Sequence, residues 1–156
     1  FMQMKKILLL LIVLSIFSQI SIAQQTAATK NNSATASPDY KVAVEFLNKY
    51  IQVFNSNSNI KNDVFLKQCG LVTKNFITKF YAYNNDDDLL FDPVVAAEDF
   101  PTEFVFDNMD AKTGYIIVRG TGNYSHKVAV KLIQVSGKWL VDGSGVINIP
   151  KDKRPK

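Results

Sequence analysis

The sequence predicts an α+β domain in which helices come first and a curved antiparallel sheet of four strands follows. Two observations support this prediction. Before Asn84, apolar residues recur at three- and four-residue spacing, which is typical of amphipathic helices. After Glu103 the spacing becomes two, which is typical of strands that bury one face. Helices gathered on one face of an antiparallel sheet form an α+β architecture.

Three helices are expected in the first half of the chain. Ser37-Pro38-Asp39 favours a helix start, with a capping hydroxyl, a proline at the first helical position and an acid in the first turn. The polar stretch from Asn55 ends this helix. A short second helix over 64–68 would end at Gly70, and Thr73 would cap a third one. The predicted buried stripes are Ala43, Phe46, Leu47, Tyr50, Ile51, Val53 and Phe54 in the first helix, and Phe76, Ile77, Phe80 and Tyr81 in the third.

The alternating pattern places four strands and the turns between them. The first strand is expected around Phe104 and Phe106, and the second over 115–119. Glycines predict turns at 120–122 and 136–137. The third strand has Tyr124, His126, Val128, Val130 and Leu132 on one face and Lys127 and Lys131 on the other, and the fourth contains Trp139 and Val141 before a glycine bulge at 143–145.

The amino end of the chain indicates export. Lys5 and Lys6 precede an apolar run over 7–17, and Ser21 and Ala23 are small residues at the two positions that a signal peptidase reads. A membrane span would need about 20 apolar residues, so we expect cleavage and no stable membrane insertion afterwards. The expected location is the periplasm or the extracellular space. The expected organisation is a signal peptide over 1–23, a flexible linker over 24–37, the folded domain over 38–150 and a solvated basic tail over 151–156.

Charge and cysteine content narrow the function classes. Two of the 18 Lys and Arg residues lie in the signal segment, which leaves 16 against 14 acidic residues, a net charge of +2. This charge is too small to favour nucleic acid as a partner. The single Cys69 excludes an internal disulfide, and we expect an inert, half-buried thiol because nothing near it in sequence would lower its pKa.

Short motifs resemble a known family. The order of the elements and the closing hairpin Val135-Ser136-Gly137-Lys138-Trp139-Leu140-Val141-Asp142 resemble the nuclear transport factor 2-like superfamily. Within it, Leu71-Val72-Thr73-Lys74-Asn75-Phe76, Phe91-Asp92-Pro93 and Glu98-Asp99-Phe100-Pro101 are similar to the DUF3828 family of exported bacterial proteins. The resemblance covers roughly residues 40–149. It implies a cystatin-like α+β fold and no agreed biochemical activity, and it allows a homodimer through an exposed sheet face. The family often has Gln where this chain has Glu98, which would add a charge to any ligand contact there.

The segment over 86–110 contains nine acidic residues and no Lys or Arg. Asp92, Glu98 and Asp99 could raise one another's pKa and act as acid and base. The alternative, which we favour, is that Asp92 and Asp99 cap turns beside the prolines that lie next to them or nearby.

The acidic triplet Asp86-Asp87-Asp88 is a candidate docking surface for a basic protein partner. Asn84, Asp86 and Asp88 alternate like the ligands of a calcium loop. The glycine and the distal Glu of such a loop are missing, so a solvated acidic loop is the better interpretation and no metal is predicted.

We expect the sheet to curl around the first helix as a half-open cone, with a ligand at its mouth. His126 is the only histidine, so it cannot build a zinc site without further nitrogen or sulfur ligands. It could act as a general base with Asp92 or Asp99, although a hydrogen-bonded rim residue is the more common role. The candidate rim consists of Asp92, Glu98, Asp99, Tyr115, Arg119, Tyr124, His126 and Trp139.

Three functions fit these observations. The first is an exported, non-catalytic module that binds a small molecule or a peptide end in the cone. The second is an envelope interaction module, of inhibitor or immunity type, that docks through Asp86-Asp87-Asp88. The third is a hydrolase or isomerase that uses His126 with Asp92 or Asp99. No cofactor is indicated, and Ser144 lacks the spacing of a nucleophile elbow.

Overall fold

The computed structural model describes residues 37–56, 60–84 and 89–156 and confirms the α+β prediction. The predicted signal peptide, most of the predicted linker and the triplet Asp86-Asp87-Asp88 lie outside the described residues. Within these ranges, none of the helices has the length and apolar character needed to cross a bilayer. The elements are α2 (Tyr40–Asn55), α3 (Asn62–Gln68), α4 (Lys74–Asn84), β1 (Phe104–Met109), β2 (Ile116–Gly120), β3 (Lys127–Val135), β4 (Lys138–Ser144) and the 3-10 helix η1 (Lys151–Lys153).

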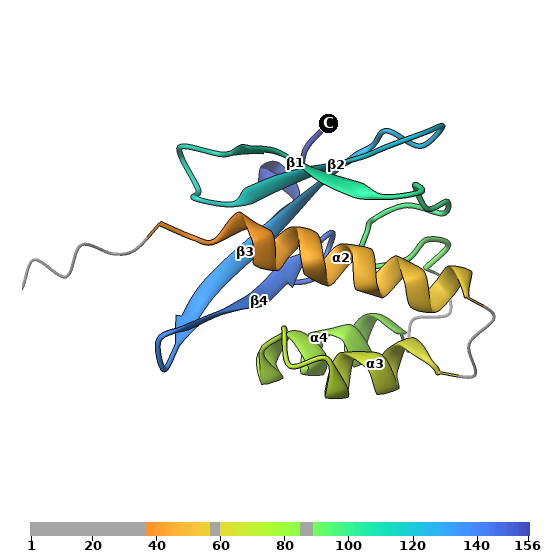
Figure 1. The fold of residues 1–156 in the computed structure, drawn as a ribbon, viewed down its shortest axis with the longest axis horizontal. Helices are drawn as coiled ribbons and strands as arrows, with labels where there is room; N and C mark the ends of the chain where they lie inside the picture. Colours follow the sequence, from red (N-terminus) through yellow and green to blue (C-terminus); the bar gives the residue numbers. More distant parts are fainter. Residues whose placement is uncertain (1–36, 57–59, 85–88) are drawn as a thin grey trace, which may run out of the picture. The chain divides into compact units, whose positions relative to one another are not determined.

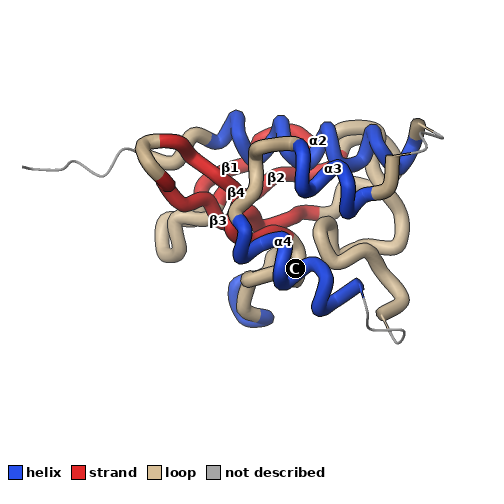
Figure 2. The backbone as a smooth tube through the Cα atoms, turned by 90° about the horizontal axis from the view of Figure 1, so that it is seen from below, coloured by secondary structure: helices blue, strands red, loops and turns tan. Residues whose placement is uncertain are grey.

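The four strands form one antiparallel meander in the order β1-β2-β3-β4. Figure 1 shows α2 running across one face of this sheet, with α3 and α4 beside it near β4. Figure 2 shows the molecule from below, with α2 and α3 above the strands in that view and α4 below them. Backbone hydrogen bonds join Thr73 and Leu71 to Val141, so the segment before α4 lies along the edge of β4.

The start of α2 differs from the prediction. Asp39 is the N-cap and its side chain accepts from the backbone N–H of Lys41 at 3.0 Å. Ser37 does not cap and Pro38 lies outside the helix, because the helix begins at Tyr40 and places Asp39 where a carboxylate reaches the orphan N–H groups. The helix has no acid in its first turn.

Most of the predicted stripe of α2 is buried. Ala43, Phe46, Leu47, Tyr50 and Ile51 lie in the core. Phe54 in the last turn is 49% exposed, against expectation, and its ring packs at a tilt against the Phe100 ring with centroids 4.5 Å apart.

The predicted end of α3 and the predicted cap of α4 are confirmed. Gly70 follows α3 with a φ of +65°. The hydroxyl of Thr73 accepts from the backbone N–H of Phe76 at 3.0 Å at the start of α4. Phe76 and Phe80 of the predicted stripe are buried, whereas Ile77 and Tyr81 are only half-buried. These positions follow from local sequence because a helix cap needs only a short stretch of chain.

The sheet contains the predicted hairpin, with Ser136 and Gly137 both at positive φ as a type I′ turn requires. The third strand begins at Lys127, so Tyr124 and His126 lie in the preceding connection and not in the strand as predicted. A tight turn that contains Gly122, at a φ of +79°, separates β2 from β3, and the pairing of these strands begins only at Lys127. The register of β3 and β4 shifts between Lys131 and Leu132.

The open edge of the sheet at β1 is closed at one end by a side chain. The amide of Asn48 in α2 donates to the carbonyl of Phe104 at 2.9 Å and accepts from its N–H at 2.7 Å. Both outward backbone groups of Phe104 are therefore satisfied by one side chain.

Large side chains fill the space between α2 and the sheet. Phe46, Tyr50, Phe76 and Phe104 are fully buried there, and the rings of Phe46 and Phe76 meet edge to face at 5.6 Å. The region that a cone would enclose is thus occupied by the core.

A buried ionic network ties α4 to the sheet. Asp142 accepts hydrogen bonds from Thr73 at 2.8 Å, Asn75 at 3.2 Å and Lys131 at 2.8 Å. Burial raises the pKa of Asp142, but these three donors outweigh it and hold the pKa below its ordinary value. The Asp142 carboxylate in the sheet is therefore satisfied by three donors.

The segment over 151–156, predicted to be a solvated tail, has four exposed residues, and the side chain of Arg154 joins it to the domain. Residues Lys151–Lys153 form η1, and the guanidinium of Arg154 donates to the carbonyl of Ile149 at 3.0 Å. Figure 1 shows η1 behind the sheet, on the side away from α2.

Candidate functional site

The loop over 91–97 is built on Asp92. One carboxylate oxygen of Asp92 accepts from the backbone N–H groups of Val94 at 2.8 Å and Val95 at 3.1 Å. Its backbone groups bond to Ala96 and Ala97, and Ala96 takes a φ of +55° to close the turn. Asp92 therefore caps the turn beside Pro93, as predicted, whereas Asp99, predicted to cap in the same way, makes no hydrogen bond within the described part of the chain.

This loop is anchored to the end of the sheet. Val94 is fully buried and its carbonyl accepts from the hydroxyl of Ser144 at 2.8 Å. The Pro93 carbonyl accepts from the N–H of Val146 at 2.9 Å. A Cβ on Gly145 would lie 2.5 Å from the carbonyl oxygens of Pro93 and Val94, so glycine is required there. Ser144 is thus an internal hydrogen-bond donor.

The second carboxylate oxygen of Asp92 is also occupied. It accepts from the hydroxyl of Tyr50 at 2.8 Å, and that hydroxyl accepts from the amide of Asn62 at 3.2 Å. Burial raises the pKa of Asp92 although the hydrogen bonds oppose this, and burial together with the nearby carboxylate raises the pKa of Tyr50. Asp92 acts as an anchor that faces the core.

His126 lies in the connection before β3. Its ring meets the Phe104 ring edge to face at 5.7 Å, and its backbone carbonyl accepts from the N–H of Gly120. The Nε2 atom is buried and has no hydrogen-bond partner among the described residues. Burial lowers the pKa of His126, with the backbone of Val95 acting in the opposite direction. Within the described residues, no hydrogen bond or ion pair joins His126 to a carboxylate.

An open pocket of about 420 Å³ lies between the two segments. A volume of this order suits a small ligand. Four of the predicted rim residues line it, namely Glu98, Asp99, Tyr124 and His126. The other lining residues are Phe91, Ala96, Ala97 and Ser125, and we call this site the acidic pocket.

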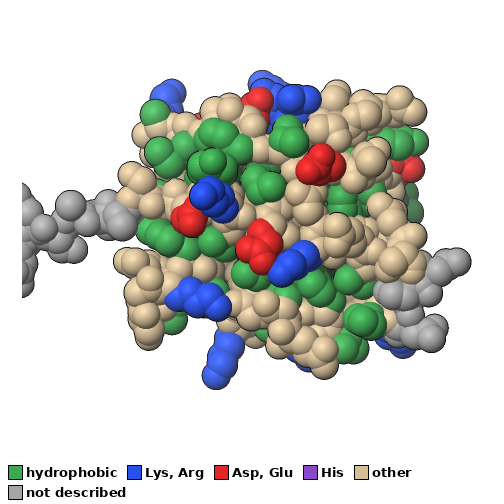
Figure 3. Space-filling model, in the orientation of Figure 1, with side chains coloured by type: hydrophobic (Ala, Val, Ile, Leu, Met, Phe, Trp, Pro, Cys, Tyr) green, Lys and Arg blue, Asp and Glu red, His purple; other side chains and the backbone are tan. Residues whose placement is uncertain are grey.

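The charge of the acidic pocket is one-sided. Glu98 and Asp99 are exposed and make no hydrogen bond or ion pair with the part of the chain that the structure describes. The described lining contains no Lys or Arg. Tyr124 is 46% exposed and supplies an aromatic wall. In contrast, Figure 3 shows basic and acidic side chains interspersed on the face that contains α2.

The remaining predicted rim residues lie elsewhere. Tyr115 packs against the separate cluster of Ile117, Ala129 and Ile149. Arg119 lies 3.8 Å from Asp107 in an ion pair. Trp139 packs against the main core from β4. The structure therefore does not bring Tyr115, Arg119 and Trp139 into the acidic pocket, and the inward-facing Asp92 does not line it either.

The other sequence candidates form no catalytic or metal centre among the residues that the structure describes. Asp86, Asp87 and Asp88 lie outside the described residues, as does the side chain of Asn84, so the docking and calcium-loop interpretations stay predictions. Within the described ranges, no three His, Cys, Asp or Glu residues gather as they would around a metal ion. Cys69 is half-buried, and burial raises the pKa of its thiol.

Sequence reasoning missed several residues of this region. Phe91, Ala96, Ala97 and Ser125 line the pocket without belonging to a recognisable motif. The partnership of Asp92 with Tyr50 crosses 42 residues of sequence. The one signal available was the stretch between Pro93 and Pro101, which is incompatible with a regular helix or a central strand and so indicates a loop.

No family model, no curated protein and no solved structure matches this chain.

Proposed function

We propose that this chain is an exported, non-catalytic domain that binds a small cationic molecule, or the cationic group of a peptide, in the acidic pocket. We also propose that it belongs to the DUF3828 family and the nuclear transport factor 2-like superfamily. A long helix crossing a four-stranded antiparallel meander supports that assignment. The basic and apolar pattern of residues 4–23 supports export.

The observation that carries the proposed function is the pair of unpaired carboxylates beside an exposed ring. Glu98 and Asp99 meet no described cation, and Tyr124 stands in the same wall. An ammonium or guanidinium group is attracted both by carboxylates and by the face of an aromatic ring. The open shape leaves room for the rest of a ligand to extend into solvent.

The chemistry of the neighbouring groups supports binding over catalysis. A general base needs a pKa near the working pH and a substrate proton within reach. The Asp92 carboxylate is occupied by Tyr50 and by two backbone N–H groups. His126 has a lowered pKa and no carboxylate partner among the described residues. A hydrolase or isomerase mechanism through these groups is therefore the weaker proposal.

The test is calorimetric titration of the mature domain with a panel of small ligands of matched size. We expect guanidinium and ammonium compounds to bind, and neutral and anionic isosteres to bind at least tenfold more weakly. Neutralising the carboxylates in Glu98→Gln/Asp99→Asn should weaken binding of the cation at least tenfold, or about 1.4 kcal/mol.

The matched control is Glu45→Gln/Glu103→Gln, which changes the net charge by the same amount. Glu45 is paired with Lys49 on the surface of α2, and Glu103 is exposed, so neither lines the acidic pocket. We expect this variant to bind like the unmodified protein. Equal weakening in both double variants would show that the ligand responds to net charge alone and would remove the proposed site.

A further inference from the structure

We propose a second ligand site, a groove that binds a tetrahedral oxyanion such as the phosphate group of a small molecule. The groove has a volume of about 490 Å³ and lies where the β1–β2 turn, β3 and the segment after η1 meet. Its floor includes Ile117, which belongs to the small cluster separate from the main core. We call it the basic groove, and it is defined by the cations Lys112, Lys127, Lys153, Arg154 and Lys156.

The cations outnumber the acids in the groove lining. Five basic side chains face two acidic ones, Asp110 and Asp152. The Asp110 carboxylate is taken up by its own turn, because one oxygen accepts from the N–H groups of Lys112 and Thr113 at 2.8 Å and from the Thr113 hydroxyl at 3.1 Å. Among the described residues, Asp152 pairs with its neighbour Lys153 alone, at 2.9 Å and in an exposed position. The lining side chains therefore carry a net charge of +3, or +2 when Asp107, the partner of Lys127, is counted with them.

Arg154 is held in place before any ligand arrives. Its Nε donates to the carbonyl of Ile149 at 3.0 Å and one terminal nitrogen donates to the carbonyl of Val146 at 3.4 Å. The other terminal nitrogen makes no hydrogen bond with the described residues. A guanidinium fixed on one edge presents its remaining N–H groups at little entropic cost, and its planar fork matches the oxygens of phosphate.

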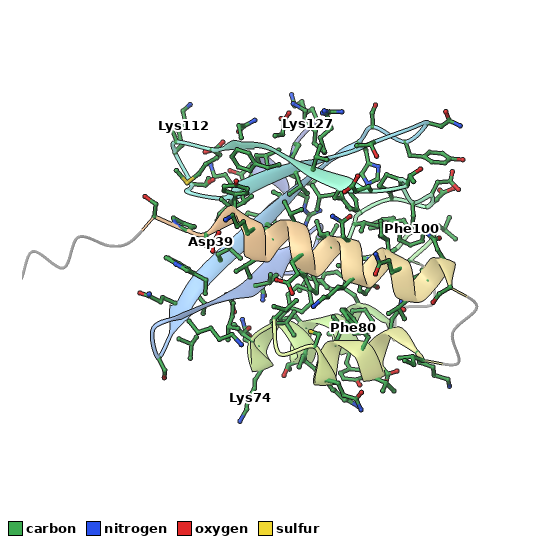
Figure 4. The ribbon with its side chains drawn as sticks, in the orientation of Figure 1. Asp39, Lys74, Phe80, Phe100, Lys112 and Lys127 are labelled. Atoms are coloured by element: carbon green, nitrogen blue, oxygen red, sulfur yellow. The ribbon has the colours of Figure 1, made fainter. Side chains whose placement is uncertain are left out.

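A second cation of the groove is also fixed. Lys127 donates to Asp107 at 2.8 Å, which holds its ammonium group beside β1. Lys112 makes no side-chain hydrogen bond or ion pair in the described part of the chain and is free to turn toward a ligand. Figure 4 shows Lys112 and Lys127 on the same side of the molecule, with Lys74 on the opposite side.

These contacts favour a small oxyanion over a larger partner. Fixed and mobile cations around a polar groove of this volume suit one phosphate or sulfate group with a compact substituent. The side chains that bind it come from the turn after β1, from β3 and from the segment after η1, so the ligand would bridge parts of the chain that are far apart in sequence.

The experiment follows amide chemical shifts and heat during titration of the mature domain with inorganic phosphate and with a soluble sugar phosphate, at low ionic strength. We expect shifts in residues 108–117 and 150–156 and a dissociation constant in the range of about a millimolar or below. The charge-reversal variant Lys112→Glu/Lys153→Glu should weaken binding at least tenfold.

The control variant Lys74→Glu/Lys79→Glu carries the same charge change on exposed positions of α4 and should bind as the unmodified protein does. Equal loss in both variants, or shifts spread over the whole surface, would overturn the proposal. A separate arm uses vesicles that contain phosphatidylglycerol. Binding to vesicles without binding to either soluble phosphate would overturn a small-ligand site and indicate a membrane surface instead.

Discussion

The acidic pocket and the basic groove are similar in size and differ in how their charges are held. In the acidic pocket, Glu98 and Asp99 stand on a loop with no partner among the described residues. In the basic groove, Arg154 and Lys127 are already bound to carbonyl and carboxylate oxygens. Unpaired charges can be neutralised with little effect on folding, whereas paired ones also support the fold. Binding and stability are therefore separable in the pocket and partly coupled in the groove.

The largest expected effect comes from a substitution that disrupts the acidic pocket and does not touch the basic groove. Gly145→Ala should lower the free energy of unfolding by about 3 kcal/mol, because the new Cβ would meet the carbonyls of Pro93 and Val94 and the φ of +60° disfavours a side chain. Urea denaturation measures the loss. We expect ligand binding in the acidic pocket to weaken as well, since the displaced loop includes Phe91 and Ala96.

Gly137→Ala is the matched control for that substitution. Gly137 also has a positive φ, of +80°, but nothing lies within 4 Å of a Cβ built there. Its cost should be about 1 kcal/mol, with no change in binding. Equal losses in the two variants would mean that backbone strain alone matters and that the close packing of the loop does not.

A smaller effect is expected at the buried carboxylate that joins α4 to the sheet. Asp142→Asn should lower the free energy of unfolding by about 2 kcal/mol at pH 7, because Lys131 and Thr73 lose a charged acceptor. The folded-state pKa of Asp142 is below its ordinary value of 3.8. The stability that Asp142 contributes is therefore fully present above pH 3.8 and is lost as the pH falls through the lower pKa of the folded state.

Urea denaturation at a series of pH values checks this sign. The gap between Asp142→Asn and the unmodified protein should narrow below pH 3.8 and stay constant between about pH 5 and 8. A gap that instead widens in acid would show that Asp142 is destabilised by burial in the folded state. The pKa of Asp92 is raised, so its effect on the free energy of unfolding should have the opposite pH dependence, and it serves as a comparison for Asp142.

The smallest effect concerns His126. Because burial lowers its pKa from 6.5, the folded state binds fewer protons than the unfolded chain below this pH. The stability that results is present above pH 6.5 and is lost as the pH falls through the folded value. His126→Gln should remove this part of the pH dependence. An NMR titration of the His126 ring with a midpoint above 6.5 would contradict the lowered pKa and the pH dependence that follows from it.

Periodic parts of the chain were predictable. The stripe from Ala43 to Ile51 and the cap at Thr73 depend on neighbours within one or two helical turns, so the sequence pattern contains them. The helix start was predicted less well, because Ser37 and Asp39 can both cap and only the position of the first turn decides between them.

The sites were less predictable because loops form them. Asp92 could be assigned to a turn from Pro93 beside it, but its bond to Tyr50 depends on how the loop packs on α2. Tyr115 and Trp139 are aromatic residues of the kind that often line ligand sites, but they pack against the two hydrophobic clusters instead. The sequence shows the basic cluster over 151–156 that supplies part of the basic groove, but not the groove itself, which depends on Arg154 folding back against Ile149.

The side chain of Asn48 has a consequence for association between molecules. It bonds to both the N–H and the carbonyl of Phe104, as a residue of a neighbouring strand would. A strand from another molecule therefore finds no free donor or acceptor at the point where β1 begins, and it would have to displace the amide first. One polar side chain of a helix thus discourages edge-to-edge polymerisation at a place where an uncapped sheet would invite it.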